Sequence, residues 1–266
     1  MPFADTAHGS LHYEIVDRVA PWRDTRETIL FHHGIGGSAE MWSGWLPALI
    51  DRYRIVLWDM RGSGRSALSG FPWSLDLLVS DVVAVADAAG SERFHLVGES
   101  IGGTVALAAT LAQPARIATL TVSNGAHLGA SLQRVQVWQK QLDEGGVKGW
   151  SDAFMSDRFH DDALTPERYA WFANQQARWL RDSILDALGV LVGTDLTLQL
   201  GNIRCPTLLL YPDGSPFIPV PIVAALHRLL PVSRLHVIGR ARHGLPFSHD
   251  RQCAALLRAF LDELSP

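Results

Sequence analysis

Short apolar runs alternate with amphipathic stretches along most of the chain. They lie at 28–32, 54–58, 94–97, 120–123, 206–211 and 234–238 and predict strands. The run at 28–32 is continuous rather than alternating, which is typical of a strand covered on both faces of a parallel sheet. Residues 11–16 alternate instead and predict a further strand. Because strands alternate with helical stretches, the pattern predicts an α/β fold: a mostly parallel sheet with helices on both faces.

The stretches between these runs carry apolar residues at helical spacing. Residues 42–50 have one apolar face, and 75–89 has another that ends at Gly90, a typical helix C-cap. Further helices are expected at 104–109, 220–230 and 253–260. With the strand pattern, these helices complete a sheet covered on both sides.

The alternation stops near His127 and resumes after Leu198. No strand is evident between them, and short helices are expected around 131–143, 147–156, 166–180 and 183–192. Thr165 followed by Pro166 is a typical helix start. The pattern therefore predicts a helical insertion above the carboxyl edge of the sheet. It divides the chain into a first core segment (1–126), a helical cap (127–198) and a second core segment (199–266).

A glycine-rich turn joins the run at 94–97 to the next helix. Its sequence is Gly98-Glu99-Ser100-Ile101-Gly102-Gly103. A Gly-x-Ser-x-Gly turn between a strand and a helix is typical of a nucleophile elbow, which exposes a strained serine above the sheet edge. A serine that merely caps a helix is the alternative. We expect Ser100 to be a nucleophile.

A serine nucleophile needs a base, an orienting acid and donors for the oxyanion. His243 and Asp213 each follow a late strand, and the order Ser100, Asp213, His243 is the one associated with this elbow. The expected oxyanion donors are the backbone N–H groups of Ile35 and Ile101. Four other polar residues near these turns are expected to brace loops or accept local hydrogen bonds. They are His32, His33, Asp59 and Glu99.

Composition limits the other functions that the chain could have. It has 266 residues, a formal net charge of −4 and no long run of either charge, which gives no reason to expect nucleic acid or an anionic membrane. Its start lacks the order of a signal peptide and no apolar run could span a bilayer, so the cytoplasm is the expected location. Cys205 and Cys253 are expected to be buried thiols. No metal-ligand spacing and no phosphate- or dinucleotide-binding pattern occurs.

Together the motifs resemble those of the α/β-hydrolase family over nearly the whole chain. The matching pieces are His33-Gly34, residues 59–66 (Asp-Met-Arg-Gly-Ser-Gly-Arg-Ser), residues 98–103 and Arg242-His243-Gly244. Within the family the chain is similar to the subgroup with a helical cap between the sixth and seventh strands, which includes 3-oxoadipate enol-lactone hydrolases and small esterases. The resemblance implies an eight-stranded sheet, no cofactor, and a Ser-His-Asp triad with an acyl-enzyme intermediate.

One turn departs from the family pattern. In register with its relatives, the triad acid position after the seventh strand falls on Ser215, and the other position used for the acid, after the sixth strand, holds Asn124. Asp213 lies two residues before Ser215, and we expect it to serve as the acid through a slightly different turn.

The predicted cap carries four of the nine tryptophans, which indicates an apolar roof over the site. Trp138, Trp171 and Trp179 are the candidate substrate-binding residues, and the expected partner is a small apolar or ring-containing molecule. The leading hypothesis is a hydrolase of carboxylic esters or lactones. A carbon–carbon bond or amide hydrolase with the same triad, and a non-catalytic binding protein on this fold, remain the alternatives. The sequence does not indicate an oligomeric state.

Overall fold

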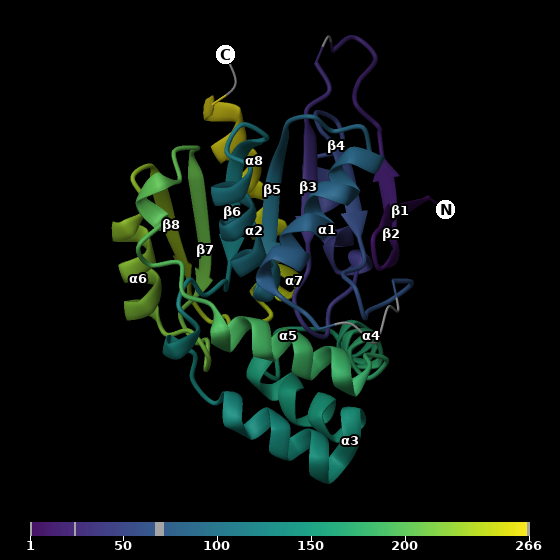
Figure 1. The fold of residues 1–266 in the computed structure, drawn as a ribbon, viewed down its shortest axis with the longest axis vertical. Helices are drawn as coiled ribbons and strands as arrows, with labels where there is room; N and C mark the ends of the chain where they lie inside the picture. The colour runs from purple at the N-terminus through teal and green to yellow at the C-terminus, as the bar shows by residue number, and fades with distance from the viewer. Residues whose placement is uncertain (1, 24, 67–71, 265–266) are drawn as a thin grey trace.

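A computed structural model describes residues 2–23, 25–66 and 72–264 (Figure 1). Eight strands form one sheet in the order β1-β2-β4-β3-β5-β6-β7-β8. Their bounds are β1 Phe3–Thr6, β2 Gly9–Val16, β3 Thr28–His32, β4 Arg54–Trp58, β5 Phe94–Glu99, β6 Ile117–Ser123, β7 Thr207–Pro212 and β8 Ser233–Ile238. Strand β2 pairs antiparallel with β1 and β4, and all other pairs are parallel. The predicted eight-stranded, mostly parallel sheet is confirmed.

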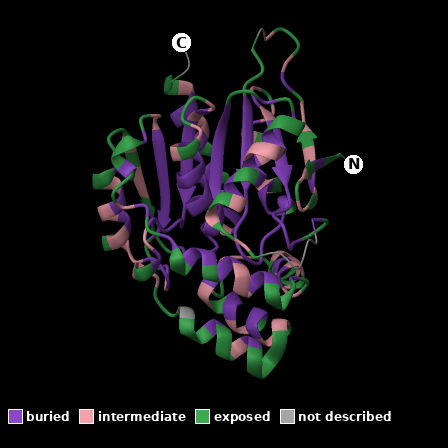
Figure 2. Ribbon diagram, in the orientation of Figure 1, coloured by how far each residue is buried: buried purple, intermediate pink, exposed green. Residues whose placement is uncertain are grey.

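The two faces of the sheet pack against different helices. Along β3, Leu30 belongs to one apolar cluster and Ile29 and Phe31 to the other, because successive side chains of a strand point to opposite faces. Helices α1 (Leu75–Ala88), α2 (Ile101–Ala112) and α6 (Val220–Leu229) cover the first face. The second is covered by η1 (Ala39–Ala48), α7 (Leu245–Ser248) and α8 (Asp250–Leu264). Figure 2 shows the buried strands between these layers.

The segment predicted as a helix at 42–50 is a 3₁₀ helix, η1, that begins and ends earlier. Pro47 lies inside it and has no N–H to donate, and Gly44 is also unfavourable in an α-helix. The predicted apolar spacing nevertheless holds, since Trp42 and Trp45 are fully buried.

Three α-helices lie between β6 and β7 and pack beyond the carboxyl ends of the strands (Figure 1). They are α3 (Val135–Arg158), α4 (Pro166–Gln176) and α5 (Arg181–Gly193), and we call them the cap helices. The helices predicted at 131–143 and 147–156 together form α3, which is broken at Gly146, where φ 61° and ψ −167° are not helical, so the predicted break between them is present. Thr165 caps α4 through a hydrogen bond from the Arg168 N–H. The domain boundaries at 127 and 198 stay a prediction.

No helix within the described ranges is long and apolar enough to cross a membrane. Both cysteines are free thiols, with Cys253 buried and Cys205 partly buried.

Candidate active site

Ser100 occupies a strained turn between β5 and α2. Its backbone has φ 55° and ψ −121°, a conformation that costs a non-glycine residue about 1–3 kcal/mol and persists only where the surroundings enforce it. The Ser100 N–H donates to the Ser123 carbonyl of β6 at 2.9 Å, which ties the turn to the neighbouring strand. A Cβ atom at Gly98 would overlap the Gly102 carbonyl oxygen, so this close approach of strand and helix requires glycine.

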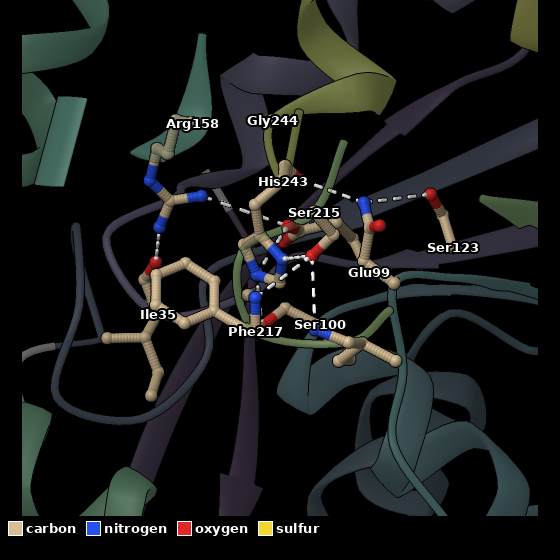
Figure 3. A network of polar contacts seen from close by, with 12 residues as sticks. Ile35, Glu99, Ser100, Ser123, Arg158, Ser215, Phe217, His243 and Gly244 are labelled. Carbon is tan, nitrogen blue, oxygen red and sulfur yellow. Dashed lines mark hydrogen bonds and ion pairs between the residues drawn. The ribbon is translucent and has the colours of Figure 1, made fainter. Parts of the chain in front are cut away.

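The structure brings Ser100 and His243 together (Figure 3). The Ser100 Oγ lies 3.1 Å from the His243 Nε2, and both residues are buried. The Asn124 side-chain amide donates to the His243 carbonyl at 2.8 Å and holds the histidine loop against the end of β6. Burial first, and then the nearby Arg158 guanidinium, hold the pKa of His243 well below its ordinary value. The imidazole is therefore neutral at neutral pH and can accept the hydroxyl proton.

The two predicted oxyanion donors flank Ser100. Ile101 is the first residue of α2, where a helix leaves its N–H groups without partners inside the helix. Ile35 lies in the loop after β3, and no hydrogen bond of its N–H occurs within the described residues. Its carbonyl accepts a hydrogen bond from the Arg158 Nη2 of α3. Their role as oxyanion donors stays a prediction.

A small cavity opens beside Ser100 and His243. Its volume is about 20 Å³, which is room for about one water molecule. Apart from Ser100, Asn124 and His243, its lining is apolar: Ala126, Leu132, Trp138, Leu188, Leu191, Phe217 and Ile218. The arrangement therefore places a serine hydroxyl and a neutral imidazole against a confined apolar space.

Known proteins resemble this chain in sequence and in fold. A family model described as alpha/beta hydrolase fold matches residues 27–150. The protein named "Putative carbamate hydrolase RutD" of Azorhizobium caulinodans is 28% identical over 250 residues, which cover 91% of each chain. The enol-lactonase of Burkholderia xenovorans LB400 has a TM-score of 0.89 at 20% identity and covers 98% of this chain and 100% of its own. The esterase EaEST of Exiguobacterium antarcticum has a TM-score of 0.87 at 20% identity and covers 98% of each chain.

The chain has the α/β-hydrolase fold. The predicted resemblance to the α/β-hydrolase fold is confirmed, and the solved structures that share this fold include an enol-lactonase and an esterase.

The far side of the imidazole departs from the Ser-His-Asp triad expected of an α/β-hydrolase. The His243 Nδ1 faces the Ser215 Oγ at 3.5 Å, and that hydroxyl also accepts the N–H groups of Phe217 and Ile218 at 3.4 and 3.3 Å. Among the described residues, no hydrogen bond or ion pair joins Asp213 to His243. A hydroxyl therefore stands where the resemblance implies a carboxylate.

The prediction that Asp213 contacts His243 is not what the structure shows. The Asp213 carboxylate accepts the backbone N–H groups of Arg240 and Ala241 at 3.0 and 3.2 Å. Because Asp213 directly follows β7, its side chain meets the turn that follows the neighbouring strand β8. Two residues later the chain has advanced far enough for Ser215 to reach the imidazole, as the register of the α/β-hydrolase motifs indicated.

A buried ion pair lies next to the serine and histidine, and the sequence did not predict it. The Glu99 Oε1 is 3.8 Å from the Arg158 Nη1 and 4.0 Å from the His243 Nε2. Glu99 and Arg158 are 1% and 2% exposed, so the pair is out of contact with water. Burial raises the pKa of Glu99 to about 7, against the lowering effects of Arg158 and the Gly34 N–H. Burial likewise lowers the pKa of Arg158 to about 10.

Arg158 connects a cap helix to the core. Its Nε donates to the Gln176 Oε1 of α4 at 2.7 Å, and its guanidinium lies over the Phe154 ring at 4.4 Å. The backbone beside it also contacts the histidine loop, because the Gly244 N–H donates to the Arg158 carbonyl at 2.9 Å. No local motif marks Arg158, since its partners come from three distant segments.

Only one of the three candidate tryptophans lines the cavity beside Ser100. Trp138 does so. Trp171 instead stacks on Phe247 with ring centroids 5.5 Å apart, on the η1 side of α4. The Trp179 indole N–H donates to the Gly37 carbonyl at 2.9 Å, so this side chain braces the loop after β3. Trp171 lies on α4 and Trp179 lies in the short segment between α4 and α5, and neither residue lines the cavity beside Ser100.

The histidines and acid expected to brace loops do so. The His33 Nε2 accepts the Met60 N–H at 3.0 Å, and the His32 Nδ1 bonds the His33 carbonyl at 2.8 Å. The Asp59 carboxylate accepts the N–H groups of Ala39 and Arg65 at 2.9 and 3.1 Å.

Proposed function

We propose that the protein is a serine hydrolase that cleaves a small carboxylic ester or lactone, with Ser100 as nucleophile and His243 as general base. The observation that carries this proposal is the 3.1 Å contact between the Ser100 Oγ and the His243 Nε2 at a strained elbow. A serine cap with no catalytic role would need neither the positive φ nor a buried neutral imidazole against its hydroxyl.

The reaction begins when the Ser100 oxygen attacks the substrate carbonyl carbon and its proton passes to the His243 Nε2. The carbonyl electron pair moves to the oxygen, where the N–H groups of Ile35 and Ile101 would stabilise the negative charge. The protonated imidazole then gives its proton to the leaving alkoxide, and an acyl-Ser100 ester remains. Water, deprotonated by His243, releases the acid and restores the hydroxyl.

The cavity favours a short acyl group. A volume of about 20 Å³ beside Ser100 holds little more than one water molecule, so the acyl part of the substrate must be small or the cap helices must move to admit it. The lining side chains are apolar, which suits a substrate whose acyl part carries no charge.

A carbamate is the second candidate substrate. The name of the relative from Azorhizobium caulinodans, which matches 91% of this chain, is that of a carbamate hydrolase. The carbonyl group of a carbamate is similar in size to that of a short acyl ester, so the same limit of the small cavity applies to both. The same serine attack would then expel an amine or an alcohol.

Turnover of p-nitrophenyl acetate and butyrate, small lactones and simple carbamates tests the proposal. We expect esters or lactones to be hydrolysed, and a serine-directed fluorophosphonate to block turnover and to label Ser100 by peptide mass spectrometry. Ser100→Ala is the control and should neither turn over nor label. Turnover of carbamates alone would favour the second candidate, and no labelling with no turnover would favour a non-catalytic binding protein.

A further inference from the structure

Transfer of a proton to His243 meets an electrostatic obstacle in this site. The Nδ1 side of the imidazole faces the Ser215 hydroxyl, which carries no charge to stabilise an imidazolium. The buried Arg158 cation lies near enough to lower the pKa of His243. An imidazolium formed during the reaction would therefore stand close to a second positive charge in a dry environment.

Glu99 is the one carboxylate within ion-pair distance of His243 among the described residues. Its Oε1 lies 4.0 Å from the His243 Nε2 and 3.8 Å from the Arg158 Nη1, so it stands close to both cations of the reacting state. This Oε1 is buried and has no hydrogen-bond partner. A buried carboxylate oxygen without a hydrogen bond is costly, which suits an atom whose partner forms only during a reaction.

The position of Glu99 is tightly determined. It directly precedes Ser100, and its other oxygen packs so closely on the loop after β3 that a Cβ atom at Gly34 would overlap it. The charged or titratable groups that face it are Arg158 of α3 and His243 of the loop after β8, and the Gly34 N–H faces it from the loop after β3. Asp157 acts on Arg158 from the same helix.

We infer that Glu99 is the positioning residue that replaces the missing triad acid: its carboxylate offsets the Arg158 charge and stabilises the His243 imidazolium from the Nε2 side. The inference rests on the proposed hydrolase function. No atom is transferred to Glu99. The proton moves from the Ser100 Oγ to the His243 Nε2 and then to the leaving group, while Glu99 stays ionised.

The inference gives the reaction a specific pH dependence. Because burial raises the pKa of Glu99 to about 7, its carboxylate is half protonated near neutral pH and mostly charged above pH 8. The pKa of His243 lies well below its ordinary value, so deprotonation of the base itself is complete at lower pH. The rising limb of kcat/KM in the free enzyme should therefore follow Glu99, with a midpoint near pH 7.

Glu99→Gln keeps the shape of the side chain and removes its charge. We expect kcat/KM for the best ester at pH 8 to fall on the order of 10²-fold, less than the roughly 10⁴-fold loss that follows neutralisation of a directly bonded triad acid. The rising limb of kcat/KM with its midpoint near pH 7 should disappear from the pH profile of this variant. Glu92→Gln, which neutralises an exposed carboxylate at the opposite end of β5, is the matched control and should keep the wild-type profile.

Adding Ser215→Asp to Glu99→Gln shows whether the loss of activity comes from the missing carboxylate charge or from a structural defect at residue 99. A carboxylate at 215 would face the His243 Nδ1 directly, so the double variant should recover at least tenfold of the lost activity. A purely structural defect at 99 would not be rescued from the other side of the imidazole. If wild type is active and Glu99→Gln keeps both its rate and its pH limb, the inference is wrong while the proposed function stands. If wild type shows no turnover, the proposed function itself fails.

Removal of the Glu99 charge leaves Arg158 unpaired, and the variant could fail to fold. Ser215→Asp alone then provides the test. It should move the rising limb of kcat/KM from near pH 7 to lower pH and raise activity at pH 6, because the imidazolium no longer depends on Glu99. An unchanged limb in this variant would overturn the inference.

Discussion

Two turns at the carboxyl edge of the sheet bring their residues to the same imidazole, but they differ in what determines them. In the turn after β5, Ser100 is held at φ 55° by consecutive residues and by glycines that the close approach of α2 requires. In the turn after β7, Ser215 reaches His243 only because the chain advances two residues past Asp213, whose carboxylate bonds the turn after β8. The first turn is determined mainly by its own residues, with one backbone hydrogen bond to β6, whereas the second depends on where the turn after the neighbouring strand β8 lies.

The comparison shows why the nucleophile is easier to identify than its orienting partner. A strained backbone restricts the residue types along the turn itself, so the motif carries the information. A side-chain partner for the imidazole needs only to arrive at the right distance, and a shift of two residues decides between a carboxylate and a hydroxyl. Single substitutions in the turn after β5 and in the turn after β7 should therefore have very different effects on activity and stability.

The largest difference in kcat is expected between removal of the His243 imidazole and removal of the Ser215 hydroxyl that faces it. His243→Ala removes the base of Ser100 and should lower kcat about 10⁴-fold or more. Ser215→Ala removes a neutral contact to the imidazole at 3.5 Å and the acceptor of the Phe217 and Ile218 N–H groups, but no charge, and should lower kcat less than about tenfold. Steady-state kinetics on the best ester measure both. A loss after Ser215→Ala as large as that after His243→Ala would show that the hydroxyl has a role the geometry does not explain.

The elbow should also be sensitive to acid. His32 lies beneath Gly102, and burial lowers its pKa from 6.5 to about 3. Below pH 6.5 the unfolded chain binds a proton at His32 that the folded protein does not. Through this histidine the free energy of unfolding should therefore decrease by up to about 5 kcal/mol as the pH falls toward 3.

Glu99 acts in the opposite direction, because its raised pKa makes the folded protein bind more protons than the unfolded chain between about pH 4.5 and 7.

The difference in unfolding free energy between wild type and His32→Asn, measured by urea unfolding at pH 7, 5 and 4, isolates the effect of His32 on stability from that of Glu99. That difference should shrink as pH falls, and a constant difference would contradict the assignment.

Adding a methyl group by a glycine-to-alanine substitution should destabilise the elbow much more than the turn after β8. Gly98→Ala places a Cβ atom on the Gly102 carbonyl and should lower the unfolding free energy by about 3 kcal/mol. Gly239→Ala meets nothing nearer than an Asp213 carboxylate oxygen at 3.7 Å and should cost less than about 0.5 kcal/mol. Urea unfolding measures both, and equal losses would mean that the elbow is no more tightly packed than the loop.

The smallest effect is expected at the residue that the sequence favoured as the acid. Asp213→Asn should lower stability by about 1 kcal/mol, because an amide accepts the Arg240 and Ala241 N–H groups less well than a carboxylate does. Its kcat should change less than about threefold. Circular dichroism melts and ester kinetics test this together, and a loss of kcat beyond a hundredfold would return Asp213 to the catalytic site.

Much of the architecture could be predicted from the sequence, because it depends on local periodicity. The continuous apolar runs locate the central strands, and Thr165-Pro166 locates the start of α4. The 3₁₀ geometry of η1 could not be predicted from spacing alone, because apolar positions at helical intervals fit several helical geometries. Trp171 and Trp179 were expected over the serine. The sequence places these aromatic residues in the cap but does not show in which direction their rings point.

The sequence by itself determined the fold class, the serine at its elbow and the histidine that follows the last strand, because glycines, apolar periodicity and strand order restrict these within short segments. Only the tertiary structure decided what surrounds that histidine. Ser215 rather than Asp213 faces its Nδ1, and Glu99 with Arg158 forms a buried pair between the core and the cap helices. Such contacts join segments far apart in the chain, and the packing of those segments against one another decides which side chain reaches the imidazole.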